Sequence, residues 1–145
     1  MSKAPDRHRT LLGDTEDDPS RRASRRTQSS DSASFAASVA ALLRDRHLEQ
    51  IIVLDLAGLS DVTDTLVIAT GTSERQIKAV GRELIHFAAD RGVSTFGQQN
   101  DTPATWSVID FVDVVIHLFD AETRAFYDLE MMWGDARIVD WEGPS

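Results

Sequence analysis

Residues 65–88, TLVIATGTSERQIKAVGRELIHFA, contain the clearest strand and helix patterns of the chain. The first six residues are almost wholly apolar, which is typical of a strand buried on both faces. Gly71 ends this run, and Ser73 with Gln76 has the spacing of a helix capping box. Apolar side chains then recur at helical spacing, at Ile77, Val80, Leu84, Ile85 and Ala88. Gly92 lies where a left-handed residue would end this helix.

The residues before this stretch predict one helix and one strand. Structure is expected to begin near Ser34, where an amphipathic helical spacing starts that comprises Phe35, Val39, Leu42 and Leu43. The short run Ile51–Leu54 has the composition of a second buried strand.

The residues after it predict three strands and a last helix. Val93–Phe96 is a strand candidate, and a polar loop follows at Gln98–Thr105. Trp106–Asp110 and Val114–Phe119 are close enough to pair as an antiparallel hairpin. Asp120 suits the N-cap of a helix that continues through residue 129. This order predicts an α/β (α+β) fold in which helices flank a mixed β-sheet of about five strands.

Length and composition indicate one globular domain. The chain has 145 residues, of which 41% are hydrophobic and 27% charged, and it contains no cysteine. We expect a disordered N-terminal tail at residues 1–32, a domain at residues 33–141 and a short tail at residues 142–145. No apolar run approaches the roughly 18 residues of a membrane span, and no signal-peptide pattern is present. These features predict a cytoplasmic protein without membrane contact.

Charge is distributed unevenly along the chain. Residues 1–31 contain seven Lys and Arg and six Asp and Glu, whereas residues 32–145 contain eight and 18, a net charge of −10. Because phosphate binding depends on clustered Lys and Arg, the acidic part disfavours broad contact with nucleic acid and favours a basic protein partner. The Arg-rich run at residues 21–26 could contact RNA or could be a solvated tail. Direct RNA contact is therefore expected to be minor or to involve this run.

Two groups of polar residues allow an enzymatic interpretation. The turn Gly71–Ser73 could present backbone N–H groups to an anion, although it lacks the spacing of a phosphate-binding loop. Asp110 and His117 could meet across the hairpin as an acid–base pair, and Asp110 with Asp113 could bind Mg²⁺. His117 could equally be a hydrogen-bonded structural residue of the sheet.

The C-terminal stretch has more aromatic and sulfur-containing side chains than one helix on a small sheet can easily bury. They are Phe126, Tyr127, Met131, Met132, Trp133 and Trp141. Because Trp, Tyr and Met are enriched at the centres of protein interfaces, this stretch indicates either a binding surface or the closure of the core.

Five sequence blocks in this order resemble the ribosomal silencing factor (Iojap) family. They are Asp64–Gly71, Gly71–Ala79, Trp106–Asp110, Asp113–Phe119 and Arg124–Ala136. The resemblance covers roughly residues 34–137, and the blocks are specific together although no single block would be.

The resemblance implies a nucleotidyltransferase-like fold without catalytic carboxylates, and a protein that is not an enzyme and needs no cofactor or metal. It implies that the chain binds the large ribosomal subunit through ribosomal protein fourteen, sterically blocks joining of the small subunit and represses translation when nutrients are scarce. Organellar relatives are associated with assembly of the large subunit, which is an alternative role. The partner-binding positions that the resemblance implies are Trp106, Asp110, His117, Phe119, Arg124, Tyr127, Leu129, Glu130 and Trp133.

This sequence departs from the family pattern at two places. Gln99 and Asn100 stand where the family usually has Glu-Gly, and Val112 stands where it usually has glycine in the hairpin turn. A β-branched residue is unfavourable at positive φ, so this turn is expected to differ or to be strained.

Two further hypotheses remain open from the residues. One is a metal-dependent nucleotidyl- or phosphoryl-transferase that uses Asp110 and Asp113, although the predicted strand Val93–Phe96 lacks the paired carboxylates of such enzymes. The other is a homodimer that buries the aromatic C-terminal surface.

Overall fold

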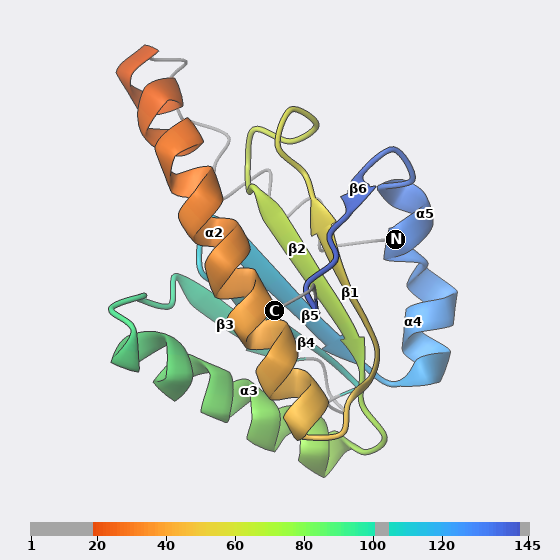
Figure 1. Ribbon diagram of the computed structural model, residues 1–145. Coiled ribbons are helices and arrows are strands. Elements are labelled where there is room, and N and C mark those ends of the chain that lie inside the picture. Colours follow the sequence, from red (N-terminus) through yellow and green to blue (C-terminus); the bar gives the residue numbers. More distant parts are fainter. Residues whose placement is uncertain (1–18, 101–104, 143–145) are drawn as a thin grey trace.

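The computed structural model describes residues 19–100 and 105–142. Within them, six strands form one sheet in the order β3-β4-β5-β2-β1-β6 (Figure 1). The strands are β1 (Glu49–Asp55), β2 (Thr65–Thr70), β3 (Gly97–Asn100), β4 (Trp106–Asp110), β5 (Val114–Phe119) and β6 (Arg137–Ile138). The helices are α2 (Pro19–Asp45), α3 (Glu74–Asp90), α4 (Ala121–Tyr127) and α5 (Leu129–Met132).

The sheet is mixed, as the sequence predicted. β2 and β5 run parallel, whereas the other neighbouring strands are antiparallel. The predicted hairpin of β4 and β5 is confirmed, with Trp106 opposite Phe119 and Asp110 opposite Val115. The additional strand β6 is only two residues long, too short to show the alternation that identifies a strand in a sequence.

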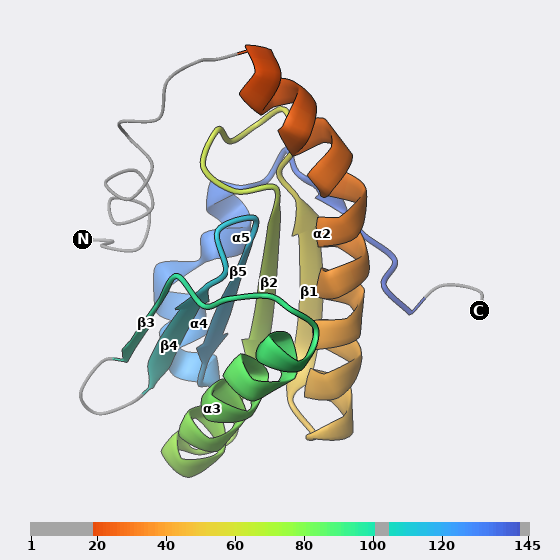
Figure 2. The same cartoon turned by 90° about the vertical axis from the view of Figure 1, so that its left-hand side faces the viewer.

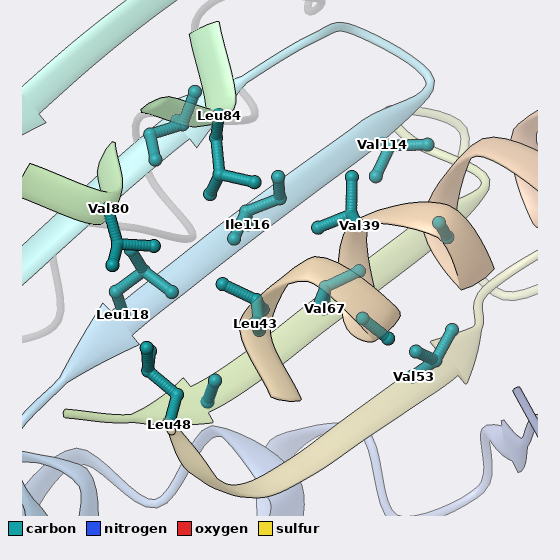
Figure 3. Packing of buried hydrophobic residues seen from close by; sticks show 14 of the residues in the cluster. Val39, Leu43, Leu48, Val53, Val67, Val80, Leu84, Val114, Ile116 and Leu118 are labelled. Atoms are coloured by element: carbon teal, nitrogen blue, oxygen red, sulfur yellow. The ribbon is translucent and has the colours of Figure 1, made fainter. Parts of the chain in front are cut away.

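The helices cover both faces of the sheet. α2 and α3 lie on one face and α4 and α5 on the other (Figure 2). On the first face, Val39 and Leu43 of α2 and Leu84 of α3 pack onto Val67 and Ile116 of the central strands (Figure 3). Burial of each such side chain stabilises the fold by about 1.5–3 kcal/mol, so this aliphatic layer is the main hydrophobic core.

The ends of α3 form as predicted. Ser73 caps its start, with Oγ accepting a hydrogen bond from the Gln76 N–H at 3.0 Å. The Gln76 side chain accepts from the Thr72 N–H at 2.7 Å, one residue earlier than in a standard capping box. At the other end, Gly92 has a φ of 76°, the left-handed conformation expected there.

α2 begins at Pro19, well before the start near Ser34 that the apolar spacing predicted. Proline suits the first turn of a helix because its nitrogen needs no hydrogen-bond partner there. Packing against the rest of the molecule is seen from Ser32 and Ala36 onward, both of which are buried. The predicted apolar spacing therefore coincides with buried residues of α2, whereas the first turns of the helix fall in the segment expected to be a disordered tail. Residues 1–18 and 143–145 of the two expected tails lie outside the described residues.

The strand predicted at Val93–Phe96 is wrong by several residues, because the observed strand is β3 at Gly97–Asn100. The Val93 N–H still bonds to the carbonyl of Ala88 at 2.8 Å, so the chain is only leaving α3 there. β3 then pairs with β4 through three polar residues and a glycine, which carry no apolar strand signal. The predicted polar loop is thus partly strand, and residues 101–104 lie outside the described part.

The single last helix that the sequence predicted is divided in two. Asp120 caps α4 as predicted, with Oδ1 accepting from the Thr123 N–H at 2.8 Å. Asp128 then adopts φ 49° and ψ 56°, which ends α4 and reorients α5. Aspartate tolerates this left-handed conformation better than most residues do. An aspartate in the sequence does not by itself predict that a helix ends there.

The hairpin turn contains the strain that Val112 predicted. Val112 has a φ of 74°, and the Asp113 N–H donates to the Phe111 carbonyl at 2.9 Å, a tight three-residue turn. The carboxylate of Asp110 accepts from the Val112 N–H at 2.7 Å and helps to hold this conformation. A β-branched residue at positive φ costs about 1–3 kcal/mol.

Candidate functional site

The segment of α4 and α5 exposes large apolar side chains. Phe126 is 77% exposed, Met131 76% and Met132 46%. We call these three residues the α4–α5 surface. Tyr127 and Trp133 are partly buried beside them and pack into the second face of the sheet. Exposed apolar side chains that gather in one place are more often a binding surface than scattered ones.

Acidic side chains accompany the α4–α5 surface. Glu122, Asp128 and Asp135 are exposed, and Glu130 is partly exposed. No basic residue lies between Arg124, which is buried, and Arg137. The surface therefore combines apolar anchors with negative charge, which matches a basic partner better than an acidic one.

An aromatic cluster lies between the α4–α5 surface and the sheet. The ring centroid of Trp106 lies 4.4 Å from that of Tyr127 and 5.5 Å from that of Phe119. Trp106 Nε1–H donates a hydrogen bond to Nδ1 of His117 at 3.0 Å, and both residues are buried. A histidine that accepts through Nδ1 carries its proton on Nε2 when it is neutral. This bond favours the structural interpretation of His117 over a catalytic one.

Arg124 ties the two short helices to the sheet. Its side chain is buried, with 5% of the residue exposed, and Nη1 donates to the Gln50 carbonyl and to Thr70 Oγ1, both at 2.7 Å. Nε and Nη2 donate to the carboxylate of Glu130 at 3.2 and 3.0 Å. Arg124 thus joins α4, α5, β1 and β2, and fixes how α5 is presented after the break at Asp128.

The carbonyl of Gln50 is available to Arg124 because β1 is irregular at this point. Gln50 has a φ of 49°, and the register with β2 shifts between Glu49 and Ile52, as in a β-bulge. No pattern in the sequence predicted either the bulge or the role of Gln50 and Thr70 as partners of Arg124.

The structure separates the nine predicted partner-binding residues into two groups. Tyr127, Glu130 and Trp133 are partly exposed. The six that are buried are Trp106, Asp110, His117, Phe119, Arg124 and Leu129. A partner role for these nine residues stays a prediction. In this structure the six buried residues can affect a bound partner only by positioning the more exposed residues that they contact.

The turn Gly71–Ser73 is explained without an anion. A Cβ at Gly71 would lie 2.6 Å from Cγ1 of Ile77, so the close approach of the helix requires glycine. The Gly71 N–H donates to the Phe119 carbonyl at 2.8 Å, and the Thr72 N–H donates to Gln76. These donors are therefore already engaged by the chain itself.

The residues of the enzymatic alternatives lie on the hairpin of β4 and β5. The register places Asp110 opposite Val115 and His117 opposite Val108, two positions apart on the same face. In the described ranges, 19–100 and 105–142, no three His, Asp or Glu side chains gather as they would to hold a metal ion. The helices of this part of the chain include none that is long and apolar enough to span a membrane.

Comparison with known proteins places these features in one family. Residues 27–145 match the family model described as "Ribosomal silencing factor during starvation". The chain is similar to the ribosomal silencing factor of Halalkalibacterium halodurans, with 38% identity over 68% of this chain and 85% of the relative. The corresponding factor of Bacillus subtilis is 37% identical over 70% of this chain and 86% of its own length. A crystal structure of a protein from Bacillus halodurans superposes with a TM-score of 0.61 at 32% identity, covering 74% of this chain and 94% of that one.

Proposed function

Since the chain belongs to the ribosomal silencing factor family, a family of regulators rather than enzymes, we propose that it binds the large ribosomal subunit through ribosomal protein fourteen. Bound there, it occupies space that the small subunit needs and so blocks subunit joining in the cytoplasm. The result is repression of translation under nutrient limitation. This mechanism needs neither catalysis nor a cofactor.

The observation that carries the proposal is the exposed α4–α5 surface. Phe126 and Met131 leave most of their apolar area in water in the free chain. Burying each against a partner would contribute about 1.5–3 kcal/mol, which is the size of an interface anchor. An isolated domain gains nothing from exposing them.

Charge supports a basic protein as the partner. Residues 32–145 carry a net charge of −10, and acidic side chains accompany the apolar anchors. Complementary charge speeds association and suppresses wrong partners more than it adds affinity. We therefore expect association with the subunit to slow as salt rises, while the apolar contacts keep the complex together.

The buried support explains why the binding surface is defined before the partner arrives. Arg124 holds α5 through Glu130, and Trp106 packs under Tyr127. A surface that is already ordered loses less conformational entropy on binding. Occlusion of a large subunit by a small protein requires such an ordered contact.

Sedimentation with isolated large subunits, small subunits and whole ribosomes tests this function. We expect selective binding to large subunits, loss of subunit reassociation, and competition by isolated ribosomal protein fourteen. Failure to bind large subunits at both low and moderate salt would overturn the proposal. Binding to precursor particles alone would point instead to the assembly role, and concentration-dependent self-association that excludes the subunit would point to a homodimer.

A further inference from the structure

Most of the basic residues in the acidic part of the chain are occupied within the molecule. Residues 32–145 contain eight Lys and Arg. Five of them interact with neighbouring side chains: Arg44 with Asp45, Trp141 and Glu142, Arg46 with Glu83, Arg91 with the ring of Phe87, Arg124 with Glu130, and Arg137 with Asp55.

The remaining three cations lie together on α3. Arg75, Lys78 and Arg82 are exposed and make no hydrogen bond or ion pair with any residue that the structure describes. At 100° per residue they fall within an arc of about 60° on the helix. We call these three residues the α3 basic stripe. His86, also exposed, continues the same line one turn further along the helix.

The α3 basic stripe points away from the sheet. The buried residues of α3 include Ile77, Val80, Leu84 and Ala88, which occupy the opposite side of the helix. Two carboxylates flank the stripe: Glu83 is already bonded to Arg46, and the exposed Glu74, four residues before Lys78, forms no ion pair with any residue that the structure describes. Like charges four residues apart, such as Lys78 and Arg82, destabilise a helix slightly. The three cations are thus solvent-exposed, and none of them forms an ion pair with a residue that the structure describes.

We propose that the α3 basic stripe binds the phosphate backbone of a helical RNA. Its cations are spaced by about one helical turn, 5–6 Å between Cβ atoms, and so form a regular line of positive charge. Arg and Lys contacts to phosphates position a protein on nucleic acid without reading its sequence. A narrow stripe also suits a domain whose other surfaces are acidic, because only one helix needs to approach the phosphates.

A lipid surface fits the stripe less well than RNA does. Helices that lie in a membrane interface combine their cations with large apolar side chains that insert below the headgroups. The exposed apolar residues of α3 are the small Ala79 and Ala89. An acidic peptide would be attracted by the same charges, and the test below includes it.

The RNA contact goes beyond the protein contact proposed above and does not depend on it. α3 covers the face of the sheet opposite to α4 and α5 (Figures 1 and 2). One molecule can therefore bind a protein through the α4–α5 surface and RNA phosphates through α3 at the same time.

Binding of the full chain to a labelled RNA hairpin, measured by fluorescence anisotropy, tests the inference. The variant carries Arg75→Gln, Lys78→Gln and Arg82→Gln, which keep helix propensity and remove the charge. We expect at least about tenfold weaker binding at about 50 mM salt and a slope of log K against log salt that is shallower by about 2–3. An unchanged urea midpoint would show that the variant is folded.

The matched control carries Arg44→Gln, Arg46→Gln and Arg137→Gln, which remove the same charge from exposed cations that already pair with carboxylates of the chain. We expect this variant to keep the RNA affinity and salt slope within about twofold of the unmodified chain. Equal losses in both variants, or a loss in the control alone, would overturn the assignment to α3. A stripe variant that still binds the hairpin normally would overturn it as well.

Two comparators decide the class of partner. The inference would be contradicted if the stripe bound a poly-glutamate peptide or phosphatidylserine vesicles more tightly than it binds the RNA hairpin. Weaker binding of both supports the inference.

Sedimentation with large subunits separates this result from the proposed function. A stripe variant that loses the hairpin but still binds large subunits leaves the proposed function intact. If large subunits bind neither the unmodified chain nor the stripe variant, the proposed function is wrong. The result with the RNA hairpin is not affected by that outcome.

Discussion

The two faces of the sheet are built in different ways. The face under α2 and α3 is mainly aliphatic, with residues such as Leu43, Leu84 and Ile116, and its phenylalanine rings, Phe35, Phe87 and Phe111, add further apolar packing. The face under α4 and α5 places an aromatic cluster next to directed polar bonds, including Trp106 with His117 and those of Arg124. Aliphatic packing supplies stability without fixing direction, whereas hydrogen bonds and a buried ion pair fix where a segment lies.

The difference shows what the blocks near the C-terminus do in this molecule. Three residues of these blocks, Trp106, His117 and Arg124, are buried. The apolar residues in contact with water are their neighbours Phe126 and Met131. The second face is therefore a support that presents a surface, while the first face holds the sheet together.

The largest effect in this comparison is expected from Arg124→Met. The substitution leaves Glu130 and two oxygen acceptors without the guanidinium, and we expect a loss of about 3 kcal/mol in the free energy of unfolding. Urea unfolding measures it. Arg137→Met is the matched control, because Arg137 pairs with Asp55 in an exposed position and should cost about 1 kcal/mol or less. Equal costs would contradict the special role of Arg124.

A smaller effect is expected from Trp106→Phe, which keeps an aromatic ring and removes the indole N–H. His117 Nδ1 then loses the donor at 3.0 Å inside the protein. We expect a loss of about 1–2 kcal/mol in the free energy of unfolding. His117→Phe combined with Trp106→Phe should cost less than the sum of the two single changes. Strict additivity would show that the two side chains are not coupled.

Val112→Gly is expected to stabilise the protein by about 1 kcal/mol. Glycine adopts the φ of 74° without strain, and this gain exceeds the cost of glycine's greater freedom in the unfolded chain. Thermal unfolding measures the shift. Val112→Ala keeps a Cβ and should give little of this gain, so an equal increase in both variants would argue against backbone strain.

The smallest effect concerns Arg46 and Glu83, which join α2 to α3 on the aliphatic side. Hydrogen bonds from Arg46 lower the pKa of the Glu83 carboxyl, so the pair stabilises the fold above the ordinary pKa of glutamate. This stabilisation is lost as pH falls through the lowered pKa. Glu83→Gln should therefore be less stable than the unmodified protein near neutral pH and equal to it in acid. A difference that stays constant with pH would contradict this account.

Elements that are defined by local apolar spacing could be predicted from the sequence. β2, the capped start of α3 and the hairpin of β4 and β5 follow directly from such spacing. β3 could not be placed because it is a polar strand, and its partners are set by pairing with β4. The first turns of α2 have no apolar stripe, so nothing in their pattern separates a helix from a tail.

The aromatic and sulfur-containing residues after residue 125 left two interpretations open, a surface or the closure of the core. The structure divides them: Phe126, Met131 and Met132 are exposed, whereas Tyr127, Trp133 and Trp141 pack against the core. Which of those residues would be buried depends on the break at Asp128 and on the bulge at Gln50, whose backbone conformations are set by tertiary contacts. No local sequence pattern predicts the helix break at Asp128 or the bulge at Gln50.

Binding of large ribosomal subunits by a variant with Phe126→Ala and Met131→Ala shows whether the α4–α5 surface contacts the ribosome. Phe96→Ala is the control, because Phe96 is a 52% exposed aromatic residue next to β3. We expect the double variant to keep the urea midpoint but to bind large subunits more weakly by about 3 kcal/mol or more, over roughly a hundredfold, while the control binds normally. Unchanged binding by a folded double variant would contradict the claim that the α4–α5 surface contacts the ribosome.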